Sequence, residues 1–209
     1  MIRAYDKMYL NIAQCSLGAM LDFAVHDLNL TLDGFYNKFI NSDVSVQFAR
    51  GNCSYIAGRS GIELALDVLG IDDGSAYYRP VLDRSEEYWT GWALAYFQWT
   101  TGLLFKSIND YISILEIRRM YHPYHEMDIT NFVQKMTELF RSRKQESNLK
   151  IYRIKQGISQ RELAEGTGVP LRTIQQYEQR QKNINAAKTE TLINISRYLF
   201  CNVDDLMEI

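Results

Sequence analysis

The sequence predicts an all-α fold with two domains, the first larger than the second. Apolar residues recur at helical spacing along most of the 209-residue chain, Gly and Pro number only 12 and 3, and too few candidate strands remain to build a sheet. A composition of 46% hydrophobic and 23% charged residues excludes a largely disordered, collagen-like or coiled-coil chain.

The N-terminal part is predicted to form a series of short amphipathic helices. Residues 5–28 carry apolar residues at helical spacing and predict the first of them. Two short helices are expected to follow, in LDGFYNKFI and DVSVQFARG. Ser60 and Glu63 form a capping-box pattern that starts the next helix, and Gly70 ends it.

An aromatic helix is expected after a break. Residues 71–84 are the least helical stretch, because DDG marks a turn and Pro80 interrupts a helix, and a short extended arm is expected there. Residues 85–102 then form a helix, one face of which holds all three Trp of the chain: Trp89, Trp92, Tyr96 and Trp99. This face is interpreted first as core packing, and a protein-docking surface is the functional alternative.

Two further helices are expected at about 104–121, with a break near Ser113, and at 128–145. The loop between them holds residues of metal-ligand type, but not in HExxH spacing: His122, His125, Glu126 and Asp128. No metal site is therefore predicted, and Asp128 is expected to be a helix N-cap. Because no dinucleotide-binding, P-loop or nucleophile-elbow motif occurs, neither a cofactor nor an enzyme activity is predicted.

Charge divides the chain unequally. Residues 1–140 carry 11 Lys+Arg and 17 Asp+Glu, a net −6, whereas residues 141–209 carry 12 and 8, a net +4. An acidic domain fused to a basic domain that meets phosphates explains this division. Three unclustered cysteines suit a reduced cytoplasmic setting. Neither a signal peptide nor a membrane span is expected, because no leader pattern and no apolar run of about 18 residues occurs.

Residues 159–179 have the helix borders of a helix-turn-helix. Ser159 and Glu162 form a capping box, so a helix begins at Gln160. Gly168 follows that helix where a left-handed residue is needed, and Pro170 can open a second helix.

The same segment has the two inner faces of the motif. Leu163 and Ala164 belong to the inner face of the first helix, and Ile174 and Tyr177 to that of the second. A small residue lets the helices cross closely, and the apolar residues fix the angle between them. This pattern predicts a helix-turn-helix.

The wider segment 149–207 resembles the phage-repressor and Cro-like helix-turn-helix family, also called the XRE family. It has the preceding helix, the SQxELA phrase, the Tyr-Glu ending and the closing VDDL in order. The resemblance implies a five-helix domain with a structural ion pair between Arg153 and Glu178. The family usually has Gly where this chain has Arg180 and Phe200, so the segment after residue 179 is expected to take its own path.

The resemblance implies that the second helix of the motif enters the major groove of double-stranded DNA. The candidate base-contacting residues are Leu171, Arg172, Thr173, Gln175 and Gln176. The candidate phosphate-contacting residues are Gln160, Arg161 and Lys182. Ten basic and four acidic residues lie between positions 141 and 182, a net +6 that suits a phosphate-binding surface.

The predicted function is sequence-specific DNA binding by a transcriptional regulator, with a repressor as the expected class. One copy of the motif contacts a half-site, so a homodimer on a near-palindromic operator is expected. Residues 146–209 would bind DNA, and residues 1–145 would dimerise, sense an effector or bind a partner. The alternative is an antitoxin-like protein whose N-terminal domain binds a partner protein while its C-terminal domain regulates its own operon. An enzyme fused to a DNA-binding domain is a third class.

Overall fold

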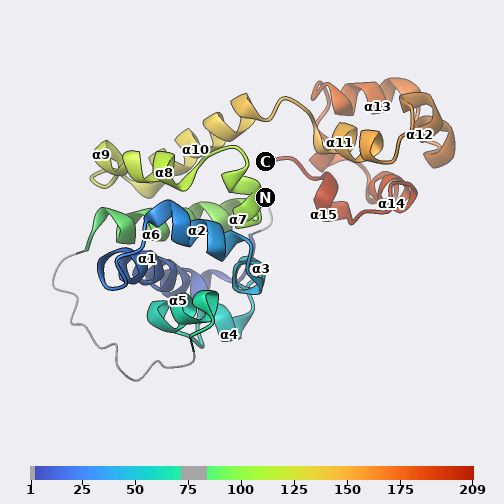
Figure 1. The fold of residues 1–209 in the computed structure, drawn as a ribbon. Coiled ribbons are helices and arrows are strands. Elements are labelled where there is room, and N and C mark those ends of the chain that lie inside the picture. The colour runs from blue at the N-terminus through green and yellow to red at the C-terminus, as the bar shows by residue number, and fades with distance from the viewer. Residues whose placement is uncertain (1–2, 72–83) are drawn as a thin grey trace. The chain divides into compact units, whose positions relative to one another are not determined.

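The computed structural model describes residues 3–71 and 84–209, which form two compact units, Met1–Phe140 and Arg141–Ile209 (Figure 1). The described residues contain helices, turns and loops and no strand, which confirms the predicted all-α fold. The extended arm expected within residues 71–84 lies outside the described residues, apart from its two end positions.

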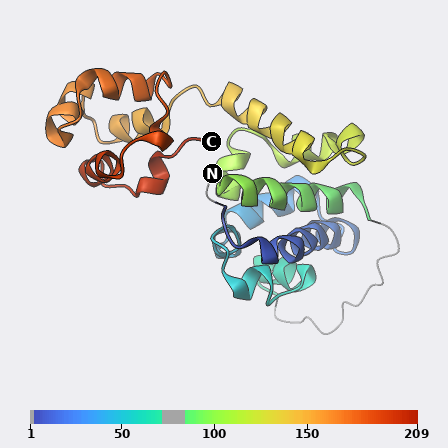
Figure 2. The same ribbon diagram turned by 180° about the vertical axis from the view of Figure 1, so that it is seen from behind.

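The N-terminal unit is built around two long helices, α1 (Leu10–His26) and α6 (Glu86–Thr101). α1 lies between α6 and α5 (Gly61–Leu69), as both views show (Figures 1 and 2). The remaining elements of this unit are η1 (Lys7–Tyr9), α2 (Leu32–Ile40), α3 (Asp43–Ala49), α4 (Cys53–Ile56), α7 (Phe105–Asn109), α8 (Ile114–Arg119), α9 (Tyr121–Tyr124) and α10 (Ile129–Arg143), which runs past the unit boundary.

Glycines let α1 and α6 approach closely. A Cβ on Gly91 of α6 would collide with the carbonyl oxygen of Leu17, and a Cβ on Gly18 of α1 would lie 2.8 Å from the carbonyl oxygen of Tyr88. Two backbones can pack this closely only where no side chain stands between them. The crossing of α1 and α6 therefore depends on glycine at both positions.

The run Lys7–His26 is the only segment of the described residues that is long and apolar enough to cross a membrane. Most of its apolar window is buried inside the unit, and Ala13, Leu17 and Leu21 are fully buried. Burial against α5 and α6 accounts for its apolar character.

Local signals predicted several helix ends of this unit correctly. Ser60 and Glu63 form the expected capping box, and Gly70 ends α5 in the left-handed conformation. Asp128 accepts hydrogen bonds from Thr130 N and Oγ1, at 2.8 and 2.6 Å, just before α10. The segment expected to be helical over about 104–121 is divided near Ser113, as predicted, into α7 and α8, with Ser113 at the N-cap of α8, and α9 follows as a separate short helix.

Glu87, in the first turn of α6, is a buried carboxylate with two partners. It accepts hydrogen bonds from His26 Nε2 at 2.9 Å and Arg118 Nε at 2.5 Å, and its residue is 5% exposed. Burial raises the pKa of Glu87, but the hydrogen bonds from His26, its own backbone and Arg118 outweigh burial and hold the pKa below its usual value. Glu87 thus joins α1, α6 and α8 through charge.

The C-terminal unit contains five α-helices: α11 (Asn148–Lys155), α12 (Gln160–Thr167), α13 (Leu171–Glu178), α14 (Thr189–Tyr198) and α15 (Val203–Leu206). A short 3-10 turn, η2 (Ile184–Ala186), connects α13 to α14. A separate apolar core joins all five helices, and it includes Leu149, Leu163, Ile174, Ile195 and Leu206.

This unit begins five residues earlier than the expected boundary at residue 146. Lys144 Nζ donates to Glu208 Oε2 at 3.1 Å, and the backbone N–H of Asn148 donates to Glu208 Oε1 at 2.5 Å. Arg141 Nε also donates to the carbonyl oxygen of Ile209, at 3.0 Å. Residues 141–148 are therefore hydrogen-bonded to the C-terminal residues of the same unit.

Candidate nucleic-acid interface

The turn between α12 and α13 has the borders expected of a helix-turn-helix. Ser159 and Glu162 form a complete capping box at the start of α12. Gly168 follows α12 with φ of +72°, a conformation that glycine adopts without steric cost. Pro170 lies at the N-cap of α13, and its carbonyl oxygen accepts hydrogen bonds from the N–H groups of Thr173 and Ile174.

Side chains from both helices of the motif form its buried face. Leu163 of α12 and Ile174 of α13 are fully buried, and Tyr177 is 5% exposed. Ala164 is also buried, at the position where a small residue was expected. The buried face of α13 leaves its other side chains turned toward solvent.

The candidate base-contacting residues lie on that outer side. Leu171 and Arg172 are exposed, and Thr173, Gln175 and Gln176 are half-buried. Thr173 also lines a hollow of about 580 Å³ shared with Lys182 and Lys188. The exposed side of α13 thus presents the donors and acceptors that base recognition requires, beside two lysines.

A network of hydrogen bonds fixes the C-terminal end of α13. Arg153 binds Glu178 with two parallel bonds, Nε to Oε1 at 2.6 Å and Nη2 to Oε2 at 3.0 Å. Gln160 Nε2 also donates to Glu178 Oε2, at 2.7 Å. The hydrogen bond with Glu178 raises the pKa of Arg153. The pair that the family resemblance implies is therefore present, and Gln160 belongs to the same network.

The two other phosphate candidates are exposed cations. Arg161 lies 3.1 Å from Glu165 one turn along α12, and its side chain is 81% exposed. The ammonium of Lys182 lies 5.5 Å from the centre of the Tyr177 ring. Exposed pairs of this kind are weak, so both cations remain available to a phosphate.

Arg180 and Phe200 stand where the resembled family usually has Gly. Arg180 and Phe200 have φ of +56° and +53°, the left-handed conformation that glycine adopts without cost. Arg180 is held there by hydrogen bonds from its guanidinium to the carbonyl oxygens of Lys144 and Glu146, both at 2.8 Å. The chain thus has a glycine-like backbone conformation at both positions with non-glycine residues.

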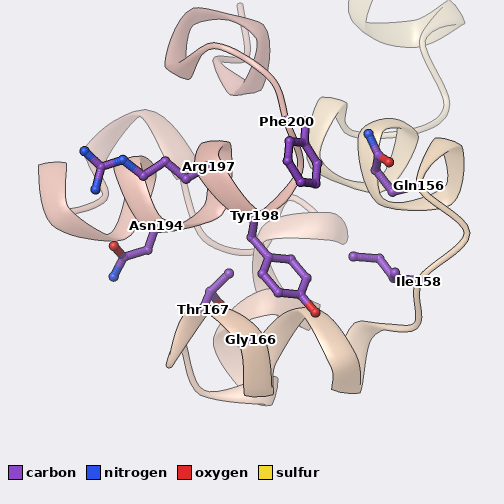
Figure 3. A pocket seen from close by; sticks show the side chains of 8 residues that line it. All are labelled: Gln156, Ile158, Gly166, Thr167, Asn194, Arg197, Tyr198 and Phe200. Carbon is purple, nitrogen blue, oxygen red and sulfur yellow. The ribbon is translucent and has the colours of Figure 1, made fainter.

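A second hollow of about 720 Å³ lies between α12 and α14, as Figure 3 shows. Tyr198 lies at its centre against Gly166, and Ile158 and Phe200 lie at its edges. None of these residues is on α13, and sequence reasoning did not select them as a site. The residue by which the sequence could have indicated this hollow is Gly166, because glycine is a poor helix former and lies here in the middle of a helix.

The aromatic face of α6 is divided between two environments. Trp99 is 5% exposed, donates from Nε1 to the carbonyl oxygen of Tyr5 at 2.8 Å and lies under the Arg3 guanidinium. Its inclusion in a candidate partner surface is therefore wrong, because N-terminal residues cover it. Trp89, Trp92 and Tyr96 are half-buried and remain accessible.

The family comparison agrees with this geometry. Residues 149–206 match the family model for the helix-turn-helix, and this match includes α11 to α15. Neither the curated proteins nor the solved structures gave a match to the chain. Residues 149–206 are therefore a helix-turn-helix domain of the XRE type, and this domain supports DNA binding by a regulator.

Proposed function

We propose that the protein is a cytoplasmic transcriptional repressor that recognises its operator with α13. The observation that carries this proposal is the division of α13 into two faces. Ile174 and Tyr177 are buried, while Leu171 and Arg172 are exposed on the other side. A helix held in this way can enter the major groove with its N-terminal residues toward the bases.

Each outer side chain suits a particular base contact. Arg172 can donate two hydrogen bonds to guanine O6 and N7, and Gln175 or Gln176 can pair with adenine. Leu171 can contact a thymine methyl group, and Thr173 can bond a base edge. These residues would supply sequence preference.

The phosphate contacts would come from residues around α13. Gln160 uses one amide hydrogen on Glu178, which leaves its second hydrogen for a phosphate oxygen. Arg161 and Lys182 would add charge, and the net +6 of residues 141–182 supports attraction to DNA. Glu178 and Arg153 would position α13 without touching DNA.

A homodimer on a near-palindromic operator is part of the proposal. One helix-turn-helix contacts a half-site, and two copies related by two-fold symmetry match the symmetry of a palindrome. The acidic N-terminal unit, at net −6, is poorly suited to phosphate contacts and better suited to holding a second subunit.

The proposal is tested by selecting DNA sequences bound by the whole protein and then comparing variants. Arg172→Ala and Gln176→Ala should each weaken preference at one base position by about 1–3 kcal/mol. Arg161→Ala should weaken binding to all sequences alike. Arg197→Ala, on α14 at the hollow of Figure 3, is the matched control and should keep the parent's preference. Unchanged preference in both α13 variants would assign base recognition elsewhere.

The antitoxin-like alternative uses the same α13 and differs in what the N-terminal unit binds. Half-buried Trp89, Trp92 and Tyr96 are the aromatic residues that a protein partner could contact. Expression of the chain with the product of an adjacent gene separates the two functions. A stable complex that masks a toxic activity would favour the antitoxin, and a homodimer that binds DNA alone favours the repressor.

A further inference from the structure

The N-terminal unit contains a hollow of about 380 Å³ that the DNA-binding function does not use. Aromatic side chains form most of its wall: Tyr88, Trp89 and Trp92 from α6, and Tyr121 and Tyr124 from α9. This volume and lining are typical of sites for small organic ligands. A flat apolar molecule would fit better here than a broad protein surface.

Buried contacts hold the aromatic wall in place. Trp89 packs edge-on against Phe132 and Tyr121, with ring centroids 5.3 and 5.6 Å apart. Phe132 is fully buried, and the ring of Tyr124 also packs edge-on against it, with centroids 6.3 Å apart. Tyr121 stacks on His125 at 4.1 Å. The wall is therefore formed before any ligand enters.

Two hydrogen-bond donors in the wall have no acceptor. Trp99 Nε1 donates to a backbone carbonyl, but the Nε1 groups of Trp89 and Trp92 have no partner among the described residues. Indole N–H groups that line a hollow can donate to a ligand that carries acceptors.

The charged groups at the rim favour an anion. Arg84 lies with its guanidinium 4.6 Å from the centre of the Tyr88 ring, and no carboxylate of the described residues pairs with it. His125, the other basic residue of the lining, has Glu126 at 3.5 Å. Among the described residues, Arg84 is thus the cation of the hollow that has no carboxylate partner. The guanidinium of Arg84 would repel a ligand cation, whereas a ligand carboxylate would form an ion pair with it.

We propose that this hollow binds a small aromatic carboxylate. The ring would lie among Trp89, Trp92 and Tyr121, and the carboxylate would accept hydrogen bonds from Arg84 and an indole N–H. The site shares no residue with the DNA-binding set, and its ligand would be the effector of the proposed repressor. Ligand binding without DNA tests the site itself, so its failure and that of the proposed function are distinguishable.

The test is calorimetric titration of the full chain with 2-naphthoate, its neutral amide and the cationic 2-naphthylmethylammonium. The carboxylate should bind at least about tenfold more tightly than either analogue, because a hydrogen bond to a charged acceptor is about twice as strong as one to a neutral acceptor. Fluorescence should change with saturation, because two of the three Trp line the hollow. A Kd for 2-naphthoate weaker than about 1 mM, or equal affinities for the three probes, would overturn the proposal.

Variants assign the contacts. Arg84→Gln should abolish the preference for the carboxylate, whereas Arg84→Lys, which keeps the charge, should retain part of it. Trp92→Phe keeps an aromatic wall, removes one N–H and should weaken carboxylate binding more than amide binding. Arg50→Gln changes an exposed arginine outside the hollow and is the matched control. An unchanged preference in Arg84→Gln with a native circular dichroism spectrum contradicts the proposed pairing.

Discussion

The ring of Tyr198 in α14 occupies the space that a Cβ on residue 166 would need, so a larger residue at that position would have to displace this ring (Figure 3). Gly166 lies inside α12, where glycine costs about 1 kcal/mol relative to alanine. The contact with Tyr198 explains why a poor helix former is present there. Helix propensity and packing oppose each other at this one residue.

Gly166→Ala should therefore destabilise the C-terminal unit in the parent chain by about 1 kcal/mol, because overpacking exceeds the gain in helix propensity. In a Tyr198→Ala background the same change should stabilise the unit by about 1 kcal/mol. Urea unfolding followed by far-UV circular dichroism measures both. Tryptophan fluorescence is the internal control, because all three Trp lie in α6 of the other unit. The same sign in both backgrounds would contradict this account.

The helix-turn-helix could be predicted from sequence because its signals are local. The capping box at Ser159, the left-handed Gly168 and the buried Ile174 each depend on residues within a few positions. The ion pair of Arg153 with Glu178 came from the family resemblance. The hydrogen bond of Lys144 with Glu208 joins residues 64 positions apart, and no local pattern indicates such a pair.

Substitution by glycine should have opposite effects on stability at the two left-handed residues of the C-terminal unit, Phe200 and Arg180. Phe200→Gly should stabilise the C-terminal unit by about 0.5–1 kcal/mol, because it removes the steric cost of a left-handed side chain at a residue that is 86% exposed. Arg180→Gly gives the same relief but loses two hydrogen bonds to the carbonyl oxygens of Lys144 and Glu146, each worth about 0.5–1.5 kcal/mol. Arg180→Gly should therefore destabilise the C-terminal unit.

The measurement is again urea unfolding by circular dichroism, with Phe200→Ala as the control that shortens the side chain without relieving the backbone. Phe200→Ala should leave stability almost unchanged. If Phe200→Gly and Phe200→Ala behave alike, backbone conformation is not the cause.

The N-terminal unit was less predictable, because its features depend on tertiary contacts. Periodicity placed Trp99 on one face with Trp89, but could not show that Arg3 and Tyr5 cover it. The pattern over 104–121 predicted the break near Ser113, but it did not show that a separate short helix, α9, begins at Tyr121. Glycine is required at Gly18 and Gly91 by the backbone of the helix that packs against each, and the residues next to them in the sequence do not indicate which helix that is.

The lowered pKa of Glu87 makes the stability of the N-terminal unit depend on pH in the acidic range. Its folded pKa lies below the ordinary value of 4.5, so its stabilising effect is complete above pH 4.5 and is lost as the pH falls through the folded pKa. Glu87→Gln cannot lose this contribution. When the pH is lowered from about 6 to below 4.5, the free energy of unfolding should therefore decrease more in the parent than in the variant.

Tryptophan fluorescence during urea unfolding measures this difference, because it reports on α6 directly. Glu138→Gln, at an exposed position of α10, should follow the parent's pH dependence. Parallel pH profiles for the parent and Glu87→Gln would show that the bonds to His26 and Arg118 do not set acid stability.

The two units are expected to divide DNA recognition and dimerisation between them. The fragment Arg141–Ile209 should keep sequence preference, because α13 and its supporting network lie within it. It must include Arg141 and Lys144, because they donate hydrogen bonds to Ile209 and Glu208 at the C-terminal end of the same unit. It should bind a full palindrome more weakly than the whole chain, since tethering two half-site contacts can raise affinity by about 10²–10⁴-fold.

Both proteins should bind a single half-site with similar affinity, because the acidic unit is not expected to add phosphate contacts. Titrating half-site and palindrome at one salt concentration gives all four affinities, and sedimentation gives the oligomeric state of each protein. Equal palindrome affinities would remove dimerisation from the role of residues 1–140 and leave ligand or partner binding as that role.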